Sequence, residues 1–180
     1  SDPDVLHTMV EDAVWWAKTY DFDGFRVDAA KHMPHSLSVN LAARITEEAE
    51  HTDVGGEPGF WLVGESFAER EVIADYIDDD QLDGQFDFPL YYALLATFID
   101  GTASLGDLAD TIAEGDSAYG AGMMSGFLGN HDVARFSTLA SQGAEESCGD
   151  DDSAFDAASA PETPDPYATM MMAWTFLFTQ

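Results

Sequence analysis

Short apolar segments alternate along this chain with longer segments of helical periodicity. Helices are expected over residues 3–20, 36–50, 70–78, 91–99, 109–115 and 166–180. Strands are expected over residues 24–28, 59–66, 84–90 and 123–132. This alternation predicts βα units, that is, an α/β fold with a parallel sheet and helices on the outside.

The charge of the chain restricts its partners. Six Lys and Arg residues oppose 35 Asp and Glu residues, which gives a formal net charge of −29. Such a charge repels nucleic-acid phosphates and anionic membrane surfaces, so neither partner is expected. It also opposes compact folding in dilute buffer, whereas salt near 1 M shortens the Debye length to about 3 Å. A salt-adapted protein with solvated acidic surfaces is therefore expected.

Carboxylates stand where the predicted strands end. The first strand ends on Asp28, the second on Glu65, and the last on His131 and Asp132. Because the carboxyl ends of parallel strands share one side of a sheet, we expect the three acids to meet there. Arg26 precedes Asp28 by two positions, so strand alternation places both side chains on one face, where the guanidinium can keep the carboxylate ionised.

Two carboxyl groups in different surroundings are the requirement for glycoside hydrolysis. One acts as an ionised nucleophile, and the other holds a proton for the leaving oxygen. Asp28 has a cation two residues away, while Glu65 has aromatic neighbours in the sequence, so different proton affinities are expected. Each acid taken alone is also compatible with a loop cap or a surface ion pair.

Three motifs in a fixed order narrow the interpretation. The segments "GFRVDAAKH" (24–32), "VGES" (63–66) and "FLGNHD" (127–132) resemble conserved regions II, III and IV of the α-amylase family, glycoside hydrolase family 13. The resemblance implies an incomplete (β/α)8 TIM barrel, with parallel strands roughly 4 to 7 and outer helices. Residues 1–180 would be a fragment of a single TIM-barrel catalytic domain, and residues 141–166 an acidic, Pro-containing loop insertion.

The resemblance assigns catalytic roles position by position. Asp28 matches the catalytic nucleophile and Glu65 the general acid/base. Asp132 matches the third catalytic carboxylate, which grips the hydroxyls of the reacting sugar. The implied reaction is retaining hydrolysis of α-1,4-glucosidic bonds, in starch-like glucans or maltooligosaccharides, through a covalent glycosyl-enzyme. We expect this activity of the full-length protein that contains these residues, and not of the fragment alone.

The same resemblance assigns substrate-binding residues. Arg26 matches the arginine that orients the nucleophile, and His131 a residue that hydrogen-bonds the reacting sugar. Lys31 and His32 match a pair that contacts the sugar on the leaving-group side. The backbone carbonyl of His32 is also implied as a ligand of a structural calcium ion, and no organic cofactor is implied.

Several alternatives stay open. A glucan transglycosylase or an α-1,6-glucosidase of the same family would carry the same motifs. A catalytically inactive relative that serves as a binding subunit is disfavoured, because all three acids are present. A nucleotide-binding domain is disfavoured too, because "YGAGMMSG" precedes a predicted strand and a phosphate loop follows one. Oligomeric state and localisation are not fixed by the sequence, although a polymeric substrate would favour a secreted or periplasmic protein in a salt-rich setting.

Overall fold

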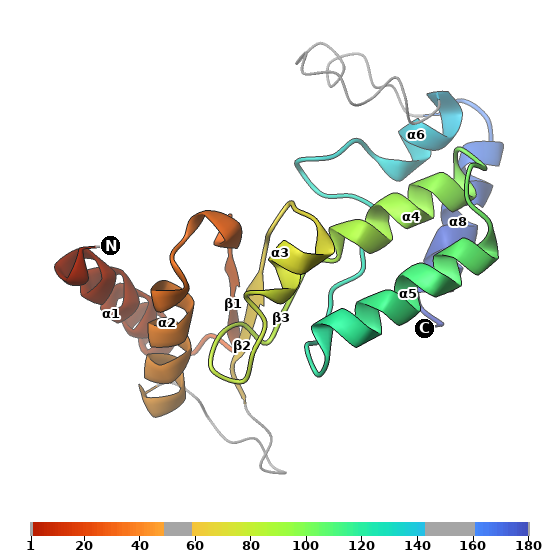
Figure 1. The fold of residues 1–180 in the computed structure, drawn as a ribbon. Helices are drawn as coiled ribbons and strands as arrows, with labels where there is room; N and C mark the ends of the chain where they lie inside the picture. The colour runs from red at the N-terminus through yellow and green to blue at the C-terminus, as the bar shows by residue number, and fades with distance from the viewer. Residues whose placement is uncertain (1, 49–58, 143–160, 180) are drawn as a thin grey trace. The chain divides into compact units, whose positions relative to one another are not determined.

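The computed structural model describes residues 2–48, 59–142 and 161–179 (Figure 1). The chain divides into two compact units. The first contains Ser1–Phe86 with Ala118–Ser125, and the second contains Asp87–Ser117 with Gly126–Gln180. Most of the predicted acidic loop, residues 143–160, lies outside the described residues.

The first unit is built on a parallel sheet. Strands β1 (Gly24–Val27), β2 (Trp61–Gly64) and β3 (Gly84–Gln85) lie side by side in that order (Figure 1). Both pairs of neighbouring strands are parallel. Beyond β3 the sheet continues into residues 123–125, where Ser125 forms a parallel bridge with Phe86. The parallel sheet that the alternating sequence predicts is therefore confirmed.

Gly84 makes this last pairing sterically feasible. The backbone amides of Met123 and Ser125 donate to the carbonyls of Asp83 and Gln85, each over 2.9 Å. A Cβ atom at position 84 would lie 1.9 Å from the carbonyl oxygen of Met123. A side chain at position 84 would thus displace residues 123–125 from the sheet.

Helices flank the strands of the first unit. They are α1 (Pro3–Tyr20), α2 (His35–Glu48), α3 (Arg70–Ala74) and the short 3-10 helix η1 (Ala30–His32). The start of α1 is capped by Asp2, whose side chain accepts from the amide of Asp4 over 3.0 Å. The apolar faces of α1 and α2 meet in one core with the strands; its buried residues include Val10, Val14, Ala17, Leu37, Leu41, Ile45, Phe60, Leu62, Tyr76 and Leu82.

The second unit is helical in the part that the structure describes. Its helices are α4 (Phe88–Phe98), α6 (Phe136–Gln142), α8 (Asp165–Leu177) and most of α5 (Leu105–Tyr119). Phe127 forms the aromatic centre of this unit, because its ring stacks on Tyr91 and meets Phe88 edge-on, both at 5.0 Å between centroids. No helix among the described residues is both long and apolar enough to cross a membrane.

Two predicted strands are shorter than the sequence indicated. The strand expected over 84–90 ends at Gln85, because Asp87 caps α4 by accepting from the amide of Leu90 over 3.0 Å. Pro89 fits the first turn of this helix, where no amide donor is needed. Of the strand expected over 123–132, only Ser125 forms a bridge among the described residues, and α6 was not predicted.

Candidate active site

The register of β1 and β2 brings two of the predicted catalytic residues together. Val27 pairs with Gly64 at the carboxyl ends of the two parallel strands. The residues that directly follow the two strands are Asp28 and Glu65, so both acids lie at the carboxyl end of the sheet. Of the three acids expected to meet, Asp28 and Glu65 thus lie side by side, and the place of Asp132 beside them stays a prediction.

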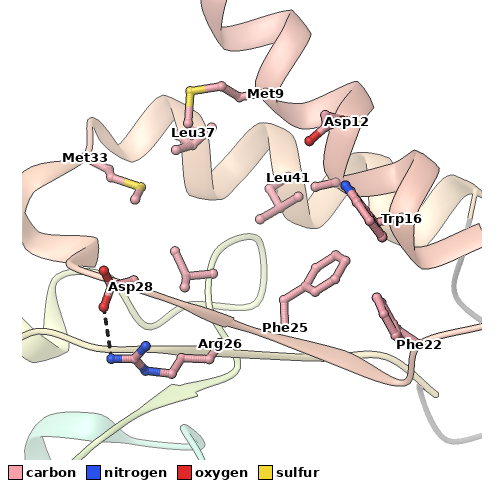
Figure 2. Close-up of a pocket in the computed structure, with 12 residues that line it drawn as sticks. Met9, Asp12, Trp16, Phe22, Phe25, Arg26, Asp28, Met33, Leu37 and Leu41 are labelled. Atoms are coloured by element: carbon pink, nitrogen blue, oxygen red, sulfur yellow. Dashed lines mark ion pairs between the residues drawn. The ribbon is translucent and has the colours of Figure 1, made fainter. Parts of the chain in front are cut away.

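Arg26 joins the two acids through a single nitrogen. Its Nη2 atom lies 2.9 Å from Oδ1 of Asp28, an ion pair that is drawn as a dashed line in Figure 2. The same atom also donates to Oε2 of Glu65. Two oxygens within hydrogen-bond reach of one nitrogen are at most about 6 Å apart. The contact between Arg26 and Asp28 that strand alternation predicts is confirmed, whereas the contact with Glu65 was not predicted.

The two carboxyl groups differ in their exposure to solvent. The side chain of Glu65 is 9% exposed, that of Asp28 is 69% exposed, and that of Arg26 is 37% exposed. A buried carboxylate is costly unless it is paired, so the contact with Arg26 compensates the burial of Glu65. Asp28, in contrast, is open to an incoming molecule.

The backbone after β1 is held in an uncommon conformation. Ala29 has a φ angle of 50°, in the left-handed region that residues with a Cβ atom rarely adopt. The neighbouring amide of Ala30 donates to the carbonyl of Glu65 over 2.8 Å, and the amide of Glu65 donates to Val27 over 2.9 Å. These bonds join the backbones next to the two acids and hold the left-handed turn in place.

Lys31 and His32 follow this turn in η1. The amine of Lys31 donates to the backbone carbonyl of Phe67 and lies 5.9 Å from the centre of the Phe67 ring. His32 is exposed. Both predicted substrate-binding residues thus lie in the first unit, on the segment that directly follows Asp28.

His131 and Asp132 lie in the second unit, where the structure describes their local surroundings. Both are exposed, and Nε2 of His131 lies 3.4 Å from Oδ2 of Asp132. Asn130 shapes their turn, because its side-chain oxygen accepts from the amides of Asp132 (2.8 Å) and Val133 (3.1 Å). The structure therefore brings together Arg26, Asp28 and Glu65 in one unit, and His131 and Asp132 in the other.

The described residues do not by themselves form a calcium site. Calcium takes six to eight oxygen ligands, usually with several carboxylates. In the part of the chain that the structure describes, no group of three or more His, Cys, Asp or Glu side chains is placed to hold a metal ion. The backbone carbonyl of His32 offers one ligand, so a calcium ion there stays a prediction.

An open apolar hollow of about 550 Å³ lies between α1, α2 and β1 (Figure 2). The side chains that line it include Met9, Trp16, Phe25 and Leu41. Its polar lining residues include Arg26, on β1, and Asp28, directly after β1. A sugar needs polar partners for its hydroxyl groups, and the aromatic and aliphatic walls offer few of them. The hollow therefore does not have the lining expected of a sugar-binding site.

Comparison with known proteins gives consistent results. The sequence model described as "Alpha amylase, catalytic domain" matches residues 1–156. An α-amylase of Streptomyces lividans is 30% identical over 151 residues, which are 80% of this chain and 16% of that protein. The chain thus spans about a sixth of the length of this curated relative.

Solved structures resemble the fold over most of the chain. An Anoxybacillus α-amylase superimposes with a TM-score of 0.73 at 25% identity, over 98% of this chain and 33% of its own. The α-amylase of Geobacillus thermoleovorans, solved with acarbose, gives a TM-score of 0.66 at 32% identity, over 78% of this chain and 30% of its own. The predicted fold class, an incomplete TIM barrel with outer helices, is confirmed.

Proposed function

Because this chain belongs to the α-amylase family, glycoside hydrolase family 13, we propose that the full-length protein is a retaining α-glycosidase. Its substrates are α-1,4-linked glucans of the starch type or maltooligosaccharides. Asp28 is the nucleophile, Glu65 the general acid/base and Asp132 the third catalytic carboxylate. Arg26, Lys31, His32 and His131 bind or orient the substrate.

The observation that carries this proposal is the shared contact of Asp28 and Glu65 with Nη2 of Arg26. It limits the two carboxylate oxygens to a separation of at most about 6 Å. Retaining glycosidases hold their two carboxyl groups about 5 to 5.5 Å apart, whereas inverting enzymes need about 6.5 to 9.5 Å to admit a water molecule. The shared contact, which keeps one oxygen of each group within about 6 Å of the other, is compatible with the shorter separation of a retaining enzyme.

The exposure of the two acids supports the division of roles. Asp28 is open to solvent and paired with a cation, so it can attack the anomeric carbon as a carboxylate. The bond from that carbon to the leaving oxygen breaks, and Glu65 gives its proton to this oxygen. Glu65 then takes a proton from a water molecule, whose oxygen attacks the same carbon and releases Asp28. Two inversions at one carbon give a product with the α configuration of the substrate.

Arg26 sets a condition on the first step. In the structure its guanidinium contacts both carboxyl groups. The general acid must hold a proton when the substrate is bound. The mechanism therefore requires that Arg26 stays with Asp28 while Glu65 is protonated.

Product analysis of the full-length protein tests the proposal. We expect it to release glucose, maltose or short maltooligosaccharides from starch and maltotriose, and NMR of the first product should show the α anomer. Isomaltose in a parallel assay separates the α-1,6-glucosidase alternative, cyclodextrin tests cleavage of a cyclic α-1,4-linked glucan, and products longer than the substrate indicate transglycosylation. A β-anomeric first product, or no cleavage of any of these substrates, would rule the proposal out.

We also propose that the protein is salt-adapted. Two of the described cations, Lys18 and Arg44, form ion pairs at the surface of α1 and α2: Arg44 contacts Glu11 of α1 and Glu47 of its own helix, each over 2.9 Å, and Lys18 contacts Glu48 over 2.6 Å. The hydrogen bond from Arg44 lowers the pKa of Glu11, and that from Lys18 lowers the pKa of Glu48. Exposed pairs contribute little each, and six cations leave a net charge of −29 to be screened by salt.

A thermal unfolding series measures this adaptation. At neutral pH we expect the melting temperature of the full-length protein to rise steadily as KCl is raised from dilute buffer to about 2 M, because added salt screens the repulsion between carboxylates. Near pH 4, where carboxyl groups take up protons, the same series should show a much weaker dependence. A melting temperature that is independent of salt at neutral pH would contradict the proposal.

A further inference from the structure

The segment that follows Asp28 is fastened by a buried tyrosine from a distant part of the chain. We name residues 29–34 the leaving-group loop, because it carries Lys31 and His32. The hydroxyl of Tyr76 donates to the carbonyl of Met33 over 2.8 Å and lies 3.4 Å from the carbonyl of Lys31. Tyr76 itself is 7% exposed and belongs to the core of the first unit. The loop is thus tied by its backbone to a side chain that cannot easily move.

His35 keeps the tyrosine ring in place. The two rings stack with centroids 4.1 Å apart and planes inclined by 16°. Both nitrogens of the imidazole have partners, because Nδ1 lies 2.9 Å from Oε1 of Gln81 and Nε2 lies 3.1 Å from Oδ2 of Asp75. The same Gln81 oxygen accepts from the hydroxyl of Ser38 over 3.0 Å. Contacts at both edges of the imidazole therefore fix the surface against which Tyr76 stacks.

The other contacts of the loop include bonds near its start and along Lys31, and at its end the carbonyl of Pro34 accepts from the amide of Leu37 over 2.8 Å while Met33 packs against the core. The amide of Ala30 donates to Glu65, and the amine of Lys31 donates to Phe67, so these atoms are held by the segment after β2. Asp28 is held separately, by Arg26. Loss of the tyrosine hydroxyl would release the carbonyls of Lys31 and Met33 without touching the contacts of Asp28 or Glu65.

We propose that Tyr76 and His35 are positioning residues that hold Lys31 and His32 in place for the sugar on the leaving-group side. This inference rests on the proposed function, since it concerns the same site. It predicts a specific kind of defect. Cleavage that depends on a sugar leaving group should suffer, whereas cleavage of a substrate without such a sugar should not.

The variant Tyr76→Phe tests this in the full-length protein, because it keeps the buried ring and removes only the hydroxyl. Two substrates are compared: maltohexaose, whose leaving group is a sugar, and α-maltotriosyl fluoride, whose leaving group is a fluoride ion. We expect kcat/KM on maltohexaose to fall about five- to tenfold, the effect of losing one ordinary hydrogen bond. On the fluoride the change should stay below about twofold, since Asp28 and Glu65 keep their contacts.

Matched variants separate positioning from general stability. Tyr91→Phe makes the same change at a buried tyrosine of the second unit and should leave both activities as they are. His35→Ala should give the same selective loss as Tyr76→Phe, whereas His7→Ala, at an exposed histidine of α1, should not.

The outcomes also separate this inference from the proposed function. If the unaltered protein cleaves both substrates and Tyr76→Phe lowers kcat/KM on both equally, or on neither, the positioning role is wrong. If the unaltered protein cleaves neither substrate, it is the proposed function that fails.

Discussion

The variant Asp28→Asn of the full-length protein is expected to lose turnover of maltooligosaccharides by about ten thousandfold or more, the scale on which removal of a covalent nucleophile slows other enzymes. The amide cannot attack the anomeric carbon, yet it has nearly the shape of the carboxylate. The fold should therefore survive, because Asp28 is exposed and lies outside the core. Initial rates on maltohexaose, with the melting temperature measured beside them, provide the test.

A smaller side chain at the same position gives a more specific readout. In Asp28→Gly, a small anion such as azide can enter the space of the lost carboxylate and attack the anomeric carbon of α-maltotriosyl fluoride. Fluoride leaves, and a single inversion gives the β-glycosyl azide. As a control, Asp79→Asn removes an exposed carboxylate on the loop after α3 and should keep full activity. Unchanged turnover in Asp28→Asn would remove the nucleophile from the mechanism.

The variant Glu65→Gln is expected to lose about a hundred- to ten-thousandfold in turnover of maltohexaose, the usual contribution of a general acid. Fluoride needs no proton to depart, so α-maltotriosyl fluoride should still react with Asp28. The second step then lacks its general base. We expect a rapid release of about one fluoride per enzyme molecule, followed by slow turnover. A rapid-mixing measurement of released fluoride, calibrated with a fluoride electrode, can follow both phases.

Matched controls guard this second prediction against a structural explanation. Gln keeps the shape of Glu65 and leaves the ion pair between Arg26 and Asp28 intact. Glu71→Gln makes the same change at an exposed position of α3 and should behave like the unaltered protein. If Glu65→Gln loses activity on both substrates equally and shows no burst of fluoride, Glu65 acts in folding or binding and not in acid catalysis.

The sequence was sufficient to predict the pairing at the centre of the site. Alternation along a strand places Arg26 and Asp28 on one face, and the parallel arrangement of β1 and β2 brings Asp28 and Glu65 to one edge. Both predictions need only local periodicity and the rule that parallel strands end on the same side. The motif order then linked these residues to a family without any knowledge of distances.

The remaining features depend on contacts between residues far apart in the sequence. Tyr76 meets Met33 across 43 positions, and His35 meets Gln81 across 46, so no local pattern marks either contact. The early start of α4 at Phe88 depends on the Asp87 cap, which overrode the β-forming aromatic residues around it. The shared contact of Glu65 with Arg26 follows from packing between two strands, which the sequence of either strand does not reveal.

In the proposed mechanism Asp28 forms a covalent bond to the sugar, while Glu65 supplies and removes the proton. Mass spectrometry of Glu65→Gln, quenched with acid during reaction with α-maltotriosyl fluoride and then digested, measures this bond directly. We expect a maltotriosyl ester on the peptide that contains Asp28, with fragment ions that place it on that residue. An ester on another carboxylate, such as Asp132, or hydrolysis to a β-anomeric product with no labelled peptide, would contradict it.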